Sequence, residues 1–211
     1  LALASEAVAL ASPSGARINT LFLANQHFTG KGTTAAAATD IKIETISTSG
    51  GETAVAGAQT LVSAANLQKY RTIATIAYNN TEAVTEWGLH TSATRTATTG
   101  SPFTTSTATS GTVTASPLTA SSATVQGQQQ TVFEATGMGT PVWGFVTSNS
   151  TSVIQIPAWY KTSDGTVGTG PTTESYTIRP VLWDRKVFAA LNVVSGDSIQ
   201  FTYTLTISSG G

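Results

Sequence analysis

The two histidines, His27 and His90, are the side chains best suited to general-base chemistry near neutral pH. A serine nucleophile would need one of them as its base, held by a third group and presented on a tight turn such as G-x-S-x-G. That turn motif does not occur in the sequence, and both histidines fall in stretches that we predict to be strands. We therefore interpret them as core or rim residues and predict no catalytic residues.

Carboxylates could hold a metal ion or, as a pair, hydrolyse a glycosidic bond. Glu82 and Glu86 stand four residues apart and share a strand face, but nothing nearby completes a two-carboxylate cleft. We predict that both are solvated. The aspartates are scattered, and turn chemistry already explains two of them, so the sequence predicts no metal site from Asp40, Asp164, Asp184 and Asp197.

Residues 30–35 read Gly-Lys-Gly-Thr-Thr-Ala, which fits the G-x-G-x-x-A fingerprint of dinucleotide-binding proteins. That motif needs a crossover connection of about a dozen residues before the next strand. Here the next predicted strand begins at residue 40, only a few residues later. We interpret the segment as a turn and predict no cofactor and no cofactor-binding residues.

Aromatic side chains on a β-sandwich could stack on sugars, and this chain has four Trp and five Tyr. Large aromatics fill cores and subunit interfaces more often, so we favour that role for most of them. Trp159 and Tyr160 are adjacent in a predicted strand and therefore point to opposite faces. One of the two must look outward, and we predict that it is a contact residue.

The C-terminal part of the chain carries the clearest structural signal. From residue 198 to 207 odd positions are apolar and even positions are Ser, Gln or Thr, which is typical of a strand with one buried face. Residues 187–193 show the same period, so we predict a hairpin that turns at residues 195–197. Its three-residue loop would pair Leu191 with Phe201 and keep polar groups off the buried face.

The same hairpin places Phe188 and Val194 on its other face. That face should be covered as well, by a second layer or by a neighbouring subunit. Phe188 and Val194 therefore join the Trp159 and Tyr160 pair as candidate interface contacts. Gly196 or its neighbour Asp197 can supply the positive φ that the loop needs.

Most of the remaining chain reads as short strands separated by Gly, Asn and Asp turns. A helical turn at 35–38 and a short helix within 53–70 are alternatives that residue propensities leave open. The fold class is therefore all-β, a β-sandwich or jelly roll with Greek-key connections and at most a short helix. The predicted strands before the hairpin cover residues 17–28, 40–47, 71–78, 84–90, 131–133, 142–146, 153–160 and 175–183.

Domain boundaries follow from composition. Residues 1–16 are predicted to form an N-terminal arm, because their apolar start is short, contains Glu6 and matches neither a secretory signal nor a membrane span. Residues 17–211 are predicted to form a single β-sandwich domain. It includes a Thr/Ser-rich excursion near residues 91–131, for which we favour short strands over a disordered linker.

Charge and cysteine content exclude several partners. Charged residues make up only 10% of the chain and the formal net charge is −1, so no basic field is available for free nucleic acid. We expect no membrane partner either. The chain has no cysteine, hence no disulfide framework and no thiolate metal site.

Two passages carry a family resemblance: Thr-Glu-Trp-Gly-Leu at residues 85–89, and Trp-Asp-Arg-Lys-Val-Phe at 183–188 leading into the closing strand at 192–205. Together they resemble the small β-sandwich structural proteins of tailed bacteriophages. The resemblance covers mainly residues 70–207. It implies a virion protein of the capsid, neck or tail surface, found as a decoration, collar or fibre-associated subunit.

From this resemblance we expect a capsid decoration or head-associated subunit that stabilises the shell through its interfaces. Its partners would be the major capsid or other virion proteins and further copies of itself, with a trimer favoured. The alternative is a carbohydrate-binding or adhesin module, for example of a phage fibre, that uses exposed aromatics on a glycan. An enzyme is the third and least favoured hypothesis.

Overall fold

The computed structural model describes residues 24–47, 54–64, 67–91, 96–98, 103–107, 109–113, 124–125, 128–129, 131–150 and 152–208. Every regular element in these ranges is a β-strand, and every strand pair is antiparallel. The predicted all-β class is therefore confirmed. The expected arm at residues 1–16 lies outside the described residues.

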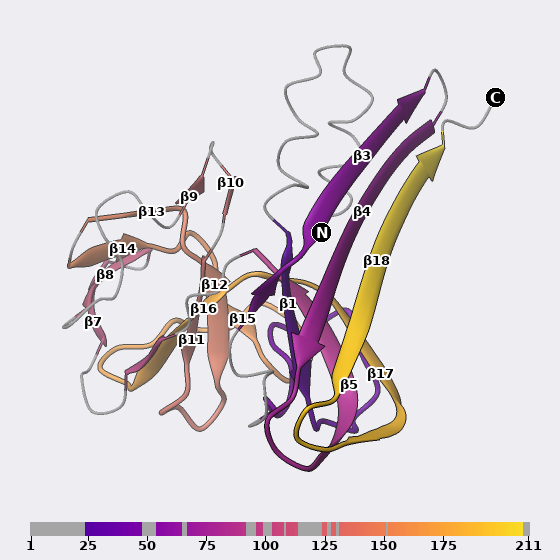
Figure 1. Cartoon of the computed structure of the whole chain (residues 1–211). Coiled ribbons are helices and arrows are strands. Elements are labelled where there is room, and N and C mark those ends of the chain that lie inside the picture. The colour runs from indigo at the N-terminus through magenta and orange to yellow at the C-terminus, as the bar shows by residue number, and fades with distance from the viewer. Residues whose placement is uncertain are drawn as a thin grey trace.

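The described chain forms two lobes, which stand side by side in Figure 1. It leaves the first lobe after β5 and returns to it at β17, so the first lobe combines early and late strands. These are β1 (Gln26–Gly30), β2 (Val55–Ala56), β3 (Ala58–Ala64), β4 (Leu67–Ala77), β5 (Glu82–His90), β17 (Leu182–Val193) and β18 (Ser198–Ser208).

The first lobe is a sandwich of two sheets with strand orders β17-β5-β1-β2 and β18-β4-β3. Two pairs of consecutive strands, β4 with β5 and β17 with β18, divide between the sheets. Thus β18 pairs with β4, with Phe201 opposite Ala74, while β17 pairs with β5, with Leu191 opposite Val84. The predicted pairing of Leu191 with Phe201 is wrong, because alternation identifies the buried face of a strand but not its neighbour.

The predicted turn between these two strands is present. Asp197 N donates to Val194 O at 3.0 Å, Val194 N donates to Asp197 Oδ2 at 2.9 Å, and Gly196 takes the positive φ of 96°. Tyr78, in the β4–β5 connection, exchanges backbone hydrogen bonds with this turn: Gly196 N donates to Tyr78 O at 2.9 Å and Tyr78 N to Asp197 O at 2.8 Å. These hydrogen bonds join the β4–β5 connection to the β17–β18 turn.

The second lobe contains the strands from β6 to β16 and has its own core. Phe133 stacks on Tyr176 at 4.8 Å between ring centroids and meets Trp159 edge-on at 5.7 Å. Its main sheets have the orders β15-β12-β11-β16-β6 and β13-β14-β8-β7, and β9 pairs with β10. The strands are β6 (Thr96–Thr98), β7 (Phe103–Thr107), β8 (Ser110–Val113), β9 (Thr124–Val125), β10 (Gln128–Gln129), β11 (Thr131–Ala135), β12 (Val142–Phe145), β13 (Ser148–Asn149), β14 (Val153–Gln155), β15 (Tyr160–Lys161) and β16 (Tyr176–Pro180).

The Thr/Ser-rich excursion supplies strands of this lobe where it is described. β6 pairs with β16, and β7 and β8 pair with each other. The described strands therefore fall into two lobes with separate cores, and the single domain over 17–211 stays a prediction. The two lobes meet at a small apolar cluster of Ile41, Val132 and Val181.

Residues 31–47 run between β1 and β2 of the first lobe and also contact the second lobe. The strand predicted within this segment is not present. Instead of a strand over 40–47 there is only an isolated bridge between Ile46 and Gly30, and residues 35–38 form no helical turn. Ile41 and Ile43 are buried, so the segment alternates like a strand while it lies across the first sheet. Within 53–70 the described residues form β2, β3 and the start of β4, with no helix.

Candidate functional site

The buried Glu86 on β5 is the centre of the largest polar cluster in the first lobe. Its side chain is fully buried and accepts four hydrogen bonds: Gly32 N and Thr45 N reach Oε1 at 2.8 Å, while Glu44 N and Arg185 Nε reach Oε2 at 2.9 Å. The prediction that Glu86 is solvated is therefore wrong. A carboxylate satisfied in this way fastens residues 31–47 to the sheet.

Arg185 on β17 provides the opposite charge. Its Nη1 donates to Asp40 Oδ2 at 2.8 Å, and Nη2 donates to Thr34 O at 3.1 Å and to Glu44 Oε2 at 3.4 Å. Burial alone would lower the pKa of Arg185, but hydrogen bonds and charges from Asp40 and Glu86 outweigh it and raise that pKa. We name Glu86, Arg185, Asp40 and Glu44 the Glu86 network. Its charged groups pair with one another, as in an ion cluster that has a structural role.

The Gly30-Lys31-Gly32 turn belongs to the same network. A Cβ atom on Gly30 or on Gly32 would lie 2.5 Å from Glu86 Oε1, closer than any side chain could tolerate. These glycines let the backbone approach a carboxylate of the same chain. The resemblance of this segment to a phosphate-binding fingerprint therefore has a structural explanation.

Glu82, the other glutamate of β5, is not solvated either. Its side chain is 5% exposed and lies 3.7 Å from Lys31 Nζ. Glu82 and Glu86 both lie on β5. Each has its own cation, so the two do not form a carboxylate pair for glycoside hydrolysis.

Glu134 on β11 is the corresponding buried carboxylate of the second lobe. It accepts from Lys42 Nζ at 2.8 Å and from Arg179, whose Nε and Nη2 both lie 2.7 Å away. Burial opposes ionisation, but the Lys42 hydrogen bond and the two positive charges outweigh it and lower the pKa of Glu134. This ion cluster links the 31–47 segment to the second lobe.

Both histidines are buried, as predicted for core residues. Trp87 Nε1 can only donate, so His27 Nδ1 accepts from it at 3.1 Å and the ring proton sits on Nε2, which donates to Thr72 Oγ1 at 3.1 Å. Burial lowers the pKa of His27 to about 4. His90 packs edge-on against Phe28 at 4.8 Å. His27 is thus a neutral core residue.

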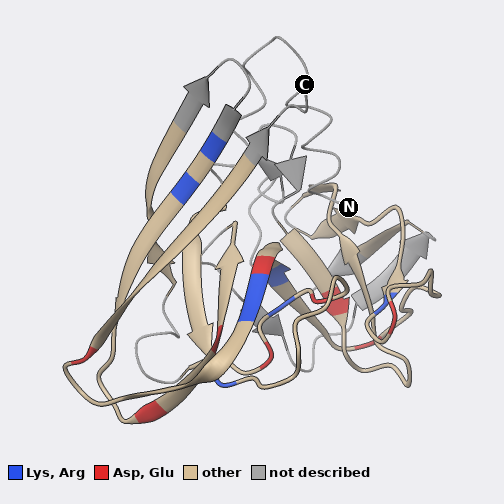
Figure 2. Ribbon diagram, turned by 90° about the vertical axis from the view of Figure 1, so that its right-hand side faces the viewer, with Lys and Arg blue, Asp and Glu red and all other residues tan. Residues whose placement is uncertain are grey.

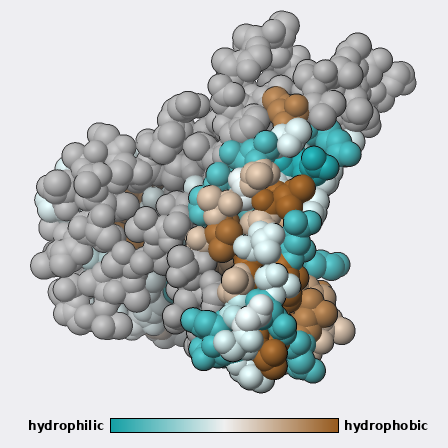
Figure 3. Space-filling model, viewed as in Figure 1, coloured by the Kyte–Doolittle hydropathy of each residue, from teal (hydrophilic) through white to brown (hydrophobic). Residues whose placement is uncertain are grey.

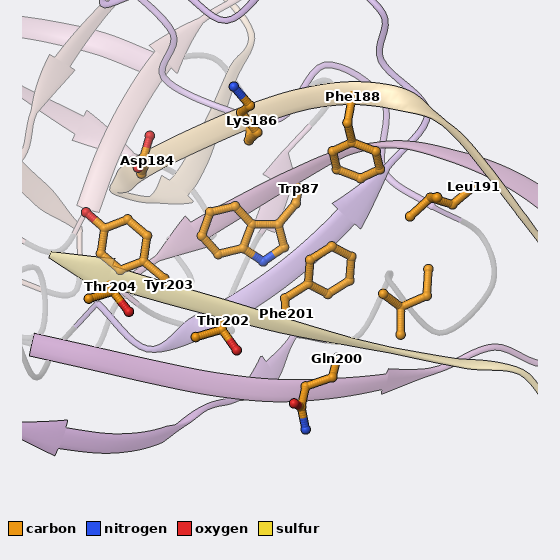
Figure 4. A pocket seen from close by; sticks show the side chains of 11 residues that line it. Trp87, Asp184, Lys186, Phe188, Leu191, Gln200, Phe201, Thr202, Tyr203 and Thr204 are labelled. Atoms are coloured by element: carbon orange, nitrogen blue, oxygen red, sulfur yellow. The ribbon is translucent and has the colours of Figure 1, made fainter.

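The first lobe has an open groove between β17 and β18 (Figure 4). The two strands diverge from the Gly196 turn and leave a space of about 520 Å³ between the sheets. Phe201 and Tyr203 point from β18 toward Trp87 on the groove floor, with ring centroids 6.2 and 5.9 Å from it. Phe188 closes the groove from the β17 side.

The interior of this groove carries no charge. Burial and the nearby Asp184 raise the pKa of Tyr203 to about 12, so its hydroxyl stays protonated in any ordinary buffer. Charged groups stand only at the rim, where β17 contributes Asp184 and Lys186. The groove is therefore suited to an apolar or aromatic-stacking occupant.

The strands on either side of the groove are both sheet edges, and they differ. β17 has two register irregularities and exposes Asp184 and Lys186. β18 is a regular strand of 11 residues without a charge, a proline or a bulge. In Figure 2, Lys and Arg colours in the three-stranded sheet appear only on its middle strand, β4. β18 thus lacks the features by which edge strands avoid pairing with other chains.

The described surface of the first lobe outside the groove is mixed in character. On the face turned to the viewer in Figure 3, hydrophobic and hydrophilic residues are interleaved. Among the side chains of this lobe that the structure describes, the large exposed apolar ones are Leu191, which lines the groove, and Val194, which lies in the turn at its end. Exposed apolar surface in this lobe thus gathers around the groove.

The four candidate contact residues fall into two places. Trp159 is 7% exposed and belongs to the second core, so Tyr160 is the outward member of that pair, half-buried against Trp143 at 5.1 Å. Phe188 lies in the groove of the first lobe and Val194 is 52% exposed in the turn. Sequence reasoning missed Trp87 and Tyr203 as groove residues, because their proximity depends on strands far apart in the chain.

No protein-family model matches this chain, and comparisons with curated proteins and with solved structures gave no match either. In the described part of the chain, no group of three or more His, Asp or Glu side chains is placed to hold a metal ion. Over the same residues, no helix is long and apolar enough to cross a membrane. The groove and the β18 edge are therefore the candidate functional site.

Proposed function

We propose that this protein is a structural subunit of a tailed-phage virion, a capsid decoration or head-associated protein that stabilises the shell through its interfaces. The observation that carries the proposal is the long, uncharged edge of β18 beside an apolar groove. Strand edges of this kind bind other chains through backbone hydrogen bonds and side-chain pockets.

The distribution of charge supports the same proposal. Glu86, Glu134 and Arg185, the most deeply buried charged side chains described, are all engaged in ion pairs that hold the lobes and the 31–47 segment together. Such groups fix the shape of the subunit. A rigid subunit that acts through its surface fits the resemblance to phage virion proteins.

The test is co-sedimentation of the purified protein with empty capsids of a phage that encodes it. We expect the protein to pellet with the shells at a fixed stoichiometry and to raise the temperature at which they disassemble. A protein that stays in the supernatant with shells, necks and tails alike would overturn the proposal. Light scattering on the unbound protein would give the oligomeric state independently of the shell.

The second candidate function is a glycan-binding module, and the groove is the observation that favours it. Trp87 and Tyr203 are nearly parallel, with an interplanar angle of 26°, and line an open groove of a kind that sugar rings can enter. A glycan array read out by tryptophan fluorescence would test it. Binding that is lost in Tyr203→Ala but kept in Tyr160→Ala would support it, and silence across the array would exclude it.

A further inference from the structure

We propose that the free edge of β18 pairs with the same edge of a second copy, antiparallel and about a twofold axis at Tyr203. The two three-stranded sheets would join into one sheet with the order β3-β4-β18-β18-β4-β3. This inference goes beyond the proposed function, because it concerns the chain alone and requires no virion.

The first argument is that β18 is an unprotected edge. β4 occupies one side of it over the whole strand, and no described strand pairs with the other side. Natural edge strands are usually short, bulged or charged, because a row of unpaired N–H and C=O groups recruits other chains. β17, the neighbouring edge, has bulges and charges, whereas β18 has neither.

The second argument is that the sequence of β18 is complementary to itself. Tyr203 is the midpoint of Ser198–Ser208, so a twofold axis there aligns the full strand length. Phe201 then faces Leu205 of the second copy, and Thr202 faces its Thr204. Apolar residues meet apolar ones and uncharged polar residues meet uncharged polar ones, without any like charges in contact.

The third argument is that this axis also brings complementary rims together. Asp184 and Lys186 stand across the groove from the part of β18 that contains Tyr203 (Figure 4). A twofold axis at Tyr203 would therefore place the β17 rims of the two copies near each other. The twofold axis makes the two β17 strands run in opposite directions. Asp184 of one copy can therefore approach Lys186 of the other.

The second copy is favoured over a strand of another protein because apolar positions of β18 face apolar positions and polar positions face polar ones along the whole strand. Pairing would also bury the half-exposed inner face of the strand: Phe201 and Tyr203 are only partly covered in the single chain. A strand edge that pairs with itself closes after two copies. The inferred assembly is thus a dimer, in place of the trimer expected from the resemblance.

The first test uses charges on solvent-facing positions of the full-length chain. Thr202 and Thr204 are exposed, so Thr202→Lys with Thr204→Lys, and Thr202→Glu with Thr204→Glu, should leave the fold intact. In the inferred register each double variant places like charges directly opposite each other, and we expect self-association to weaken roughly tenfold or more. Mixing the two variants should restore dimers, because Lys then faces Glu.

Thr75→Lys is the matched control, since Thr75 is exposed on β4, directly beside Gln200 but away from the edge. Analytical ultracentrifugation should find it as dimeric as the original protein. Unfolding midpoints in urea would check that all variants fold. An original chain that is monomeric, or double variants that associate as well as the original, would overturn the inference.

The second test reads the register by disulfide formation, which is clean because the chain has no cysteine. Directly opposed residues of an antiparallel pair lie about 4.5–5.5 Å apart at Cα, within disulfide reach, whereas diagonal neighbours lie about 7–8 Å apart. A mixture of Thr202→Cys and Thr204→Cys chains should therefore crosslink under mild oxidation, and either variant alone should not. Crosslinking of each variant with itself, or of neither mixture nor single variants, would contradict the register.

The outcome of these tests is independent of the outcome of the capsid test. A monomer that still pellets with shells would overturn the β18 pairing and leave the virion proposal standing. A dimer that crosslinks as expected but ignores shells, necks and tails would do the reverse.

Discussion

Glu86 and Glu134 are two buried carboxylates in two lobes, and they are held in different ways. Glu86 accepts three backbone N–H groups and the nearly buried Arg185, whereas Glu134 relies on Lys42 and Arg179, whose side chains are 40% and 18% exposed. In both lobes the arginine comes from the adjacent strand, at the position diagonal to the glutamate. The Glu86 network therefore fixes the course of residues 31–47, whereas the Glu134 ion cluster joins that segment to the second lobe.

The largest expected effect comes from removing the buried cation. Arg185→Met should cost about 3–5 kcal/mol of unfolding free energy, because it leaves Glu86 charged, buried and without its counter-ion. Urea unfolding would measure this. Arg179→Met is the matched control in the second lobe and should cost about 1–2 kcal/mol, since Lys42 remains beside Glu134. Equal losses would remove the distinction between the two networks.

Neutralising the carboxylates gives the next contrast. Glu86→Gln keeps the size of the side chain but places an amide NH₂ against backbone N–H donors, and it leaves Arg185 without this counter-ion. We therefore expect the free energy of unfolding to fall by roughly 2–4 kcal/mol. Glu134→Gln should lose about 1–2 kcal/mol, because Lys42 and Arg179 can turn to solvent. The order of the two variants in chemical denaturation is the decisive result, and a reversed order would contradict it.

Acid should weaken the two lobes at different pH. His27 has an ordinary pKa of 6.5 and a folded pKa of about 4, so the unfolded chain binds its proton first and stability falls as the pH drops from 6.5 to 4. The loss should reach about 2–3 kcal/mol. The folded pKa of Glu134 lies below 4.5, so its contribution is complete above that value and is lost only at lower pH.

Hydrogen exchange measured between pH 6.5 and 4.5, corrected for the intrinsic pH dependence of exchange, would separate the lobes. We expect protection to fall in β1, β4 and β5 around His27 and to hold in β11 and β16 around Glu134. A His27→Gln variant should abolish the difference. Loss of protection in both lobes together would mean that they unfold as one unit in this pH range.

The smallest effect should come from the tether between the lobes. Lys42→Ala removes a half-exposed ion pair, so the expected cost is about 1 kcal/mol or less. Its signature is local: residues 41–45 should exchange faster while the strands of both lobes keep their protection. A large global loss would show that the lobes depend on each other more than their separate cores suggest.

Elements with strong local signals could be predicted from the sequence. The strand at 198–207, the turn at Gly196 and the strand at 84–90 are present with small shifts of their bounds. The partners of these strands could not be predicted, because alternation reports which face is buried and says nothing of the neighbour. Alternation was also misleading for residues 40–47. Their backbone N–H groups at Glu44 and Thr45 donate to the Glu86 carboxylate and not to a neighbouring strand.

The candidate site was harder to predict than the fold. Glu86 looked solvated because the arginine that neutralises it lies 99 residues away in the chain. Trp87 and Tyr203 form the groove only because β17 and β18 lie in different sheets. The placement of Phe188 was predicted wrongly for the same reason: it packs against Phe201 inside the groove and not on an opposite face, because β17 and β18 do not pair with each other.

The division of the first lobe between early and late strands has a consequence for biosynthesis. β17 and β18 are translated after all other described strands, so a nascent chain carries Glu86 for nearly a hundred residues before Arg185 emerges from the ribosome. Until then the first sheet lacks an edge and its carboxylate lacks a counter-ion, and this lobe cannot be completed. β18 itself is made after the other described strands, so its uncharged edge forms only once the other strands of both lobes have been synthesised.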